Sequence, residues 1–397
     1  MRMKMQCLAG LVAFLSLSSA ALAQVGGSAD DPAAQQAPQA SPTPQPPESP
    51  KDPGLVTRPS PTPRPSSVFT PEGKIHLDVM VADTAGKALS GLGPQDFTLL
   101  DDGRPRKILS FRSFDGVNVN ANPPVRVFLV FDTVNLPFQQ VSFARQELEK
   151  FLHQNGGRLA QPVSLILMTD AGIRVQPRPS TDGNALATVL DQIKGGLHSV
   201  YTAMGADGDL QRFQLSLHQM ELIADNSAHV PGRKLLIWIG PGWPMMNSHQ
   251  FTFSDKDQSH YFENIVQLST ALREARMVVY SVTPVNVETD QTRTLMYRDF
   301  LKGVPSPRKA DTGNLALKVL AIQSGGRILG PDNHLAEQID NCIADANAFY
   351  TISFNPSPAE HADEYHDLKV VVDTPGASVR TNSGYYNQPK SPNGDSR

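Results

Sequence analysis

Residues 125–132 read VRVFLVFD, and this stretch decides the fold. Apart from Arg126 the run is apolar until it ends at Asp132. A short, nearly continuous apolar run is typical of a central strand in a parallel sheet that is covered on both faces. Ligands of such sheets bind beyond the carboxyl ends of the strands. We therefore expect any functional site to be centred on Asp132.

Strand and helix patterns alternate after this run, which predicts a doubly wound, mostly parallel α/β sheet. The α/β domain is expected to span 123–346. With 125–131 as the first, six strands are predicted, the others at 163–168, 173–176, 235–239, 277–282 and 327–329. Helices are predicted at 138–154, 183–194, 210–228, 258–276, 312–324 and 333–346, with a glycine-rich insert at 195–208.

Short strand patterns flank this domain on both sides. Those before it are 74–81, 97–100 and 107–111, and those after it are 349–354, 368–372 and 378–380. Asp101–Pro105 contains an Asp-Asp-Gly sequence that predicts a hairpin turn. About 50 residues seldom form an independent core. We therefore expect segments 68–118 and 347–387 to meet in one additional antiparallel β subdomain that resembles a β-sandwich.

The first residues have the pattern of an export signal. A positive start is followed by an apolar stretch over 8–17 and by an Ala-x-Ala cleavage site at 21–23. We expect a signal peptide at 1–23, a disordered proline-rich linker at 24–67 and a disordered tail at 388–397. The protein should be periplasmic or secreted. No later stretch is long and apolar enough to predict a transmembrane segment.

The charge of the chain bears on the kinds of partner that it can bind, and its cysteine content bears on disulfide bonding. The formal net charge is −4, which argues against a nucleic-acid partner. The compact basic cluster Arg104, Arg106 and Lys107 is expected to be a solvated hairpin. After signal cleavage Cys342 is the remaining thiol. We expect it to be a buried helix residue, with an intermolecular disulfide as the alternative.

Several segments along the chain carry a family resemblance. They are 91–97 with 102–103, 127–135, 231–234, 275–282, 324–327, 349–350 and 382–385. In this order they resemble the von Willebrand factor A-related proteins that are abundant in Acidobacteria, over roughly 70–387. The resemblance implies a von Willebrand factor A-like fold, and it implies adhesion or complex formation as the role.

The metal-binding version of that fold needs an Asp-x-Ser-x-Ser turn, a threonine on a second loop and an aspartate after the fourth strand. Val134 and Leu136 occupy the serine positions, and Gly240 follows the fourth strand. The set that could still gather around Mg²⁺ or Mn²⁺ is Asp132, Thr133, Asn135 and Thr181. We expect a degenerate site without a cofactor, in which Asp132 accepts backbone N–H bonds.

Catalytic motifs are missing from the sequence, which has no Gly-x-Ser-x-Gly elbow, no His-Glu-x-x-His helix and no phosphate loop. We name no catalytic residue, and an envelope hydrolase built near Asp132 and Asp170 is one alternative. A metal-dependent adhesin is another. Residues 360–367 hold two histidines and several carboxylates, enough for Zn²⁺ or Ni²⁺. Their position between two strands instead favours a solvated hairpin.

Recognition is expected in loops near Asp132. Trp243, Met245 and Met246 follow the fourth strand, and Trp and Met are enriched where proteins meet. The alternative for Trp243 is a buried anchor that holds its loop on the domain. Residues 285–307 form a second candidate loop. The sequence thus predicts an exported, non-enzymatic module that binds a protein partner of the envelope or the cell exterior.

Overall fold

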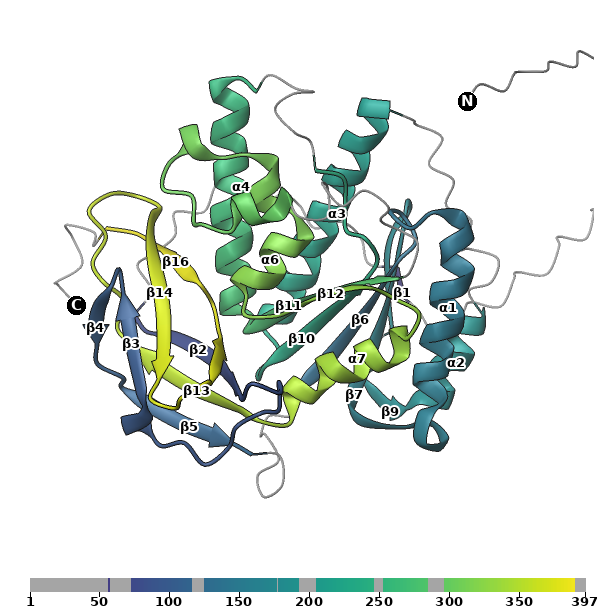
Figure 1. Cartoon of the computed structure of the whole chain (residues 1–397). Coiled ribbons are helices and arrows are strands. Elements are labelled where there is room, and N and C mark those ends of the chain that lie inside the picture. The colour runs from purple at the N-terminus through teal and green to yellow at the C-terminus, as the bar shows by residue number, and fades with distance from the viewer. Residues whose placement is uncertain are drawn as a thin grey trace, which may run out of the picture. The chain divides into compact units, whose positions relative to one another are not determined.

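The computed structural model describes residues 56–57, 73–115, 125–176, 178–192, 205–245, 253–284 and 296–389 (Figure 1). The chain divides into two compact units, Met1–Lys51 and Asp52–Arg397, and all described residues belong to the second. The predicted signal peptide, most of the linker, nearly all of the tail, Met246 and residues 285–295 lie outside the described ranges. Among the described helices, none is long and apolar enough to cross a membrane.

One large sheet confirms the predicted mixed α/β architecture with mostly parallel pairing. Its parallel strands, in spatial order, are β7 (Arg158–Thr169), β6 (Arg126–Asp132), β10 (Lys234–Ile239), β11 (Met277–Pro284) and β12 (Ile328–Asp332). Antiparallel strands complete the β7 side, namely β8 (Gly172–Val175), β9 (Ser180–Asp182) and β1 (Val56–Thr57). Within the described residues the sheet has eight strands rather than six, because β1 and β9 are too short to leave a pattern in the sequence.

Strand β6 lies inside this sheet, and its side chains point alternately into two apolar clusters, one on each face of the sheet. Val127, Leu129 and Phe131 pack with one set of helices, whereas Phe128 and Val130 pack with the other. The first set is α1 (Phe138–His153), α2 (Gly183–Gln192) and α7 (Leu335–Ile343), and the second is α3 (Gly205–Ala228), α4 (Asp255–Glu274) and α6 (Leu317–Gln323). Both faces are thus covered by helices (Figure 1). This explains why the strand is apolar without alternation.

Short 3₁₀ helices connect these elements. They are η1 (Pro94–Asp96), η2 (Gln154–Gly157), η4 (Tyr297–Phe300), η5 (Pro307–Lys309), η6 (Thr312–Leu315) and η7 (Ala344–Ala346). The predicted helix at 312–324 is therefore two pieces, because Ala316 between η6 and α6 has an extended conformation. Cys342 of α7 is buried as expected, and burial raises the pKa of its thiol.

Two four-stranded antiparallel sheets form the β subdomain. One has the order β15 (Ser378–Arg380), β2 (Ile75–Ala82), β13 (Phe349–Phe354) and β5 (Ser110–Phe114). The other has the order β16 (Gly384–Asn387), β14 (Glu364–Val372), β3 (Phe97–Asp101) and β4 (Arg104–Arg106). Side chains from both sheets share one core, so the sheets pack face to face. Each sheet takes strands from both sides of the α/β domain, and the additional antiparallel sheets are confirmed.

The hairpin after β3 differs from the prediction in its second strand. Asp102 and Gly103 have positive φ angles of 50° and 74°, and they close a two-residue turn between Asp101 and Arg104. Such a turn requires positive φ at both positions, which Asp-Gly supplies. The hairpin partner of β3 is therefore β4, and the strand predicted at 107–111 begins only at Ser110, as β5. Residues 107–109 instead cross to β5 in the other sheet.

Arginine side chains, most of them partly buried, join the β subdomain to the amino ends of the parallel strands. Arg276, which precedes β11, donates to the Asp78 carboxylate of β2. Arg233, which precedes β10, donates to the backbone oxygen of Asp345 and lies 4.6 Å from the ring centre of Phe349. The carboxylate of Asp345 also accepts from Arg380 of β15. The opposite edge of the sheet, where β6 ends, remains the one that carries Asp132.

Candidate functional site

Asp132 ends β6 and is completely buried. Its Oδ1 accepts from the backbone N–H groups of Val134 and Asn135, both at 3.0 Å. Its Oδ2 accepts from Asn135 Nδ2 at 2.8 Å and from Trp238 Nε1 at 2.9 Å. The carboxylate is thus engaged by four N–H donors, three of which come from the turn that follows the strand and one from β10.

The electrostatics of Asp132 follow from these neutral partners. Burial raises the pKa of its carboxyl above the ordinary value of 3.8, and the hydrogen bonds from Asn135, Trp238 and Val134 oppose that rise. None of the four donors carries a charge. The carboxylate therefore fixes the turn after β6, and its lone pairs face protein N–H groups rather than an open coordination position.

Gly240 follows β10, at the position where the sequence resemblance led us to look for an aspartate. A Cβ at Gly240 would lie 2.9 Å from the Cβ of Asp132 and 3.2 Å from its Oδ2. Any side chain here would have to displace Asp132 or break its bond to Trp238. The close approach of β10 to β6 therefore leaves no room for a second carboxylate at this position.

The other metal candidates do not converge on Asp132. Thr133 directs its hydroxyl to the backbone oxygen of Met168 at 2.7 Å. Asn135 Nδ2 also donates to Ser216 Oγ of α3 at 2.9 Å, while its Oδ1 is buried without a partner among the described residues. Thr181 lies on β9, whose neighbours Ser180 and Asp182 pair with Val163 and Arg158.

That pairing places Thr181 at the opposite end of β7 from Asp132. Asp132 pairs with Met168, five positions along β7 from Val163. At roughly 3.3 Å per residue this is about 16 Å. The structure therefore brings together Asp132, Thr133 and Asn135 but not Thr181. The sequence could not reveal this, because the direction of β9 depends on its pairing with β7.

The predicted recognition loop is anchored rather than free. Trp243 is buried, its Nε1 donates to the Leu315 backbone oxygen at 3.1 Å, and its ring meets that of Trp238 edge to face at 5.4 Å. These contacts support the anchor alternative. Met245 is half-buried, and Met246 lies outside the described residues. Asp170 is exposed in the turn between β7 and β8, so it does not share the buried environment of Asp132.

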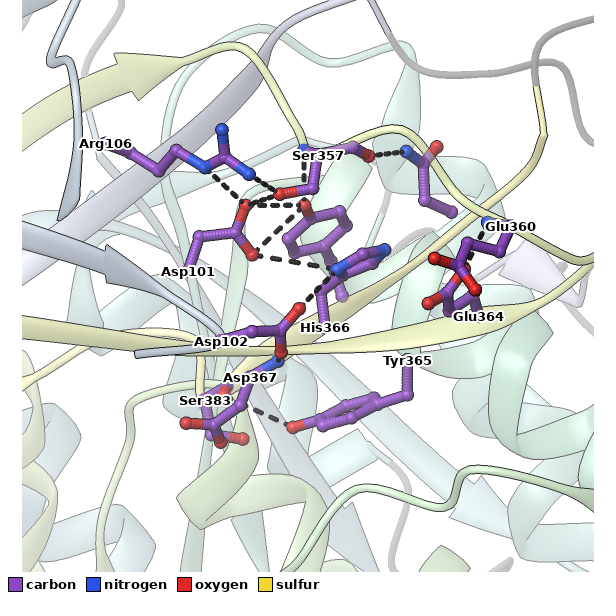
Figure 2. A network of polar contacts seen from close by, with 12 residues as sticks. Asp101, Asp102, Arg106, Ser357, Glu360, Glu364, Tyr365, His366, Asp367 and Ser383 are labelled. Atoms are coloured by element: carbon purple, nitrogen blue, oxygen red, sulfur yellow. Dashed lines mark hydrogen bonds and ion pairs between the residues drawn. The ribbon is translucent and has the colours of Figure 1, made fainter. Parts of the chain in front are cut away.

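A second polar site lies in the β subdomain and was not predicted (Figure 2). The segment 360–367 was expected to be a solvated hairpin, and His361 is indeed exposed. His366, however, belongs to β14 and is buried. It shares the inward face with Leu368, Val370 and Val372. The period-two alternation of that strand, extended back by one step, was the signal that could have placed it.

His366 joins two consecutive aspartates at the end of β3. Its Nδ1 lies 2.7 Å from Asp102 Oδ2 and 3.8 Å from Asp101 Oδ1 (Figure 2). The His366 ring stacks on that of Tyr385, with ring centres 4.9 Å apart. In the part of the chain that the structure describes, these three residues form the group of histidine and acidic side chains that is close enough to share an ion. A metal would need an unprotonated Nδ1. The carboxylate at 2.7 Å instead calls for a proton there.

Asp101 is buried beside this histidine and already has a cationic partner. Its Oδ2 accepts from Arg106 Nε at 3.0 Å, from the Tyr385 hydroxyl at 3.2 Å and from the Ser357 hydroxyl. Arg106 was expected to be solvated, but its side chain is only 33% exposed because it folds onto Asp101. The guanidinium neutralises the carboxylate and would repel a second cation. The arrangement is that of a network that holds β3, β4 and β14 together.

Apolar surface is exposed at the two open sides of the β subdomain. Among the described residues, the large apolar side chains that are exposed are Leu109, Ile322 and Val371. Leu109 lies in a groove of about 620 Å³ that is lined by η1, β3, Arg106 and residues 108–111. Ile322 and Val371 lie in a second groove of about 480 Å³, between α6 and the strands β14 and β15. Each groove includes residues of an edge strand, β4 and β5 in the first and β15 in the second.

Comparisons with known proteins show distant structural likeness. No family model and no curated protein matches the chain. The solved structures that are similar to it include the manganese-loaded TRAP protein of Plasmodium vivax and the pilus adhesin SpaC of Lactobacillus rhamnosus GG. TRAP is 9% identical with a TM-score of 0.33, covering 75% of this chain and 100% of TRAP. SpaC is 11% identical with a TM-score of 0.33, covering 77% of this chain and 50% of SpaC, so the chain spans half of that adhesin.

Proposed function

We propose that this chain is an exported protein that binds a protein partner through the edges of its β subdomain. The observation that carries the proposal is the position of Leu109, Ile322 and Val371, whose exposed apolar side chains all lie in the two edge grooves. Clustered exposed apolar surface in concave places is characteristic of interaction sites. The export signal pattern at residues 1–23 supports a location outside the cytoplasm.

The proposal includes a von Willebrand factor A-like domain whose metal site is degenerate. The segments quoted from the sequence and the parallel order β7-β6-β10-β11-β12 support that kinship. The four neutral donors on Asp132 and the close approach of Gly240 support binding without a cofactor. We therefore propose a role in adhesion or envelope assembly that does not depend on a metal and does not involve catalysis.

Affinity capture from envelope extract tests this proposal, with the whole chain and its variants as bait. Leu109→Asp and Ile322→Asp place a charge in each groove, and Thr188→Asp adds the same charge on the exposed face of α2. We expect one groove variant to lose a partner that the unaltered chain and the α2 variant retain, with or without EDTA. The dissociation constant is then measured with the purified partner, and we expect a loss of about tenfold or more.

The other outcomes are equally informative. Melting curves of the three variants should agree within a few degrees, because the altered side chains are exposed. A partner that both groove variants retain contradicts the proposed surface. A partner that EDTA removes favours a metal-dependent adhesin instead.

A further inference from the structure

We propose that the groove beside Leu109, here called the basic edge groove, receives an extended acidic segment of the partner as an added β-strand. The groove is lined by residues 94–95, 97–99, 106 and 108–111. This inference rests on the proposed function and specifies the chemistry of the partner. Its elements are the open edge of strand β5, an apolar floor and the cationic side chains of residues 104–112.

The sheet edges come first. In the part of the chain that the structure describes, β5 pairs only with β13 and β4 pairs only with β3. Residues 107–109 cross from β4 to β5, so the outer edges of the two small sheets adjoin. An open edge presents backbone donors and acceptors to an incoming strand. Addition of an extended peptide to such an edge is a recurring mode of protein recognition.

The groove floor is aromatic and aliphatic. Phe97 and Phe111 line it with ring centres 5.2 Å apart, and both rings contact Tyr350, which is buried in the core of the subdomain. Ile108 and Leu109 line the same groove, and Leu109 is 42% exposed. Because side chains of a strand alternate between its faces, an added strand would direct every second residue to this floor. Apolar residues are expected at those positions of the partner.

The rim is cationic. Residues 103–114 contain four cationic side chains and no acidic one, although the whole chain has a net charge of −4. Arg104, Lys107 and Arg112 are exposed, and Arg106 lines the groove. Acidic residues on the outward positions of an added strand would complement this rim. The expected segment therefore alternates acidic and apolar residues.

A second copy of this chain fits the same edge less well. Pairing of two β5 edges about a twofold axis would bring Arg112 and its neighbours from both copies together. Like charges directly opposite each other destabilise a strand pair. The charge of the rim thus favours a partner of different sequence over self-association.

A fluorescein-labelled peptide of alternating Glu and Val serves as the probe, with fluorescence anisotropy of the full chain as the readout. We expect the Glu-Val peptide to bind and a matched Lys-Val peptide not to bind. A Glu-Val peptide with N-methyl groups on the amides that would face β5 should also fail, because it cannot donate to the strand edge. Binding should weaken as salt is added.

The double variant Arg104→Glu with Lys107→Glu should raise the dissociation constant of the Glu-Val peptide by about tenfold or more. The control double variant Lys256→Glu with Lys302→Glu makes the same charge change at exposed positions elsewhere and should bind as before. Equal binding of the Lys-Val peptide, full binding of the methylated peptide or an unaffected double variant would each overturn the inference. Self-association would overturn it as well. The result to look for in sedimentation is a dimer of the unaltered chain that the Arg104 and Lys107 double variant disrupts, while the Glu-Val peptide does not bind.

Failure here is distinguishable from failure of the proposed function. If a captured partner is lost with Ile322→Asp but kept by the Arg104 and Lys107 double variant, the protein binds through the other groove. The binding function then stands, and strand addition at the basic edge groove does not.

Discussion

The carboxyl end of the parallel sheet and the β subdomain each bury an aspartate completely, but they satisfy it in different ways. Asp132 accepts only from neutral N–H groups, and its surroundings are closed by Trp238 and Gly240. Asp101 accepts from two hydroxyls and from the guanidinium of Arg106, which reaches the surface. An aspartate thus fixes a buried turn in one region, whereas in the other it belongs to a charged network that reaches the surface.

The place where the fold predicts a ligand site and the surface that is open for binding are therefore different parts of the molecule. Sheet topology points to the strand end at Asp132 as the ligand edge. Exposed apolar and cationic side chains, however, gather along the edges of the β subdomain. The position of a residue in a fold is therefore not enough to assign a binding site. The hydrogen-bond partners of its polar atoms must also be known.

Removal of the Asp132 carboxylate should have the largest effect. Asp132→Ala leaves buried N–H groups of Val134, Asn135 and Trp238 without acceptors. We expect a loss of about 3 kcal/mol or more in the free energy of unfolding, measured by urea denaturation. Asp170→Ala, at an exposed turn position, should change it by less than about 0.5 kcal/mol. If the two variants cost the same, the turn after β6 does not depend on this carboxylate.

Loss of the Arg106 guanidinium should have a smaller effect. Arg106→Ala leaves the buried Asp101 with hydroxyl donors alone. Because the arginine is partly exposed, water can replace some of its contribution, and we expect a loss of about 2 kcal/mol. Arg104→Ala, on the same short strand but exposed, is the matched control and should be nearly neutral. Equal unfolding free energies for both variants would contradict the role of Arg106 as the counter-charge of Asp101.

The smallest effect is expected in pH dependence. Burial raises the folded-state pKa of Asp132 above 3.8, so this carboxyl takes up a proton more readily in the folded protein than in the unfolded chain. Its contribution to stability is fully present below that value and is lost as pH rises through the folded pKa. Measured against Asp132→Asn, which does not titrate, the wild-type unfolding free energy should fall as pH rises from about 4. A gap that widens in favour of the wild type would show that the hydrogen bonds outweigh burial.

Much of the α/β sheet follows from local pattern, because its strands are apolar on both faces and its helices repeat at regular spacing. The position of Asp132 at the end of β6 was predictable for this reason. Its partner Trp238 lies 106 residues away, and the direction of an indole N–H depends on packing between strands. Thr181 was misplaced for a similar reason, since a three-residue strand carries no information about which end of β7 it meets.

The β subdomain was harder to predict where its strands are polar. β16 and β4 have too few residues to show alternation, and β5 is separated from β4 by a crossing rather than by a turn. His366 was hidden by its polar neighbours, although the pattern of β14 contained the information. Trp243 presented two alternatives that composition cannot separate. The contact of Trp243 with the Leu315 backbone oxygen supports the anchor alternative, and it exists only in the folded chain.

The interleaving of strands in the two small sheets has a consequence for the order of folding. β2 lies between β15 and β13, and β3 pairs with β14. The strands of residues 73–115 therefore pair with strands that lie more than 200 residues later in the chain. Contacts of such sequence separation form slowly, because closing long loops costs entropy before any pairing is gained. The first strands to be synthesised are therefore among the last to be completed, and until then their edges need protection from aggregation.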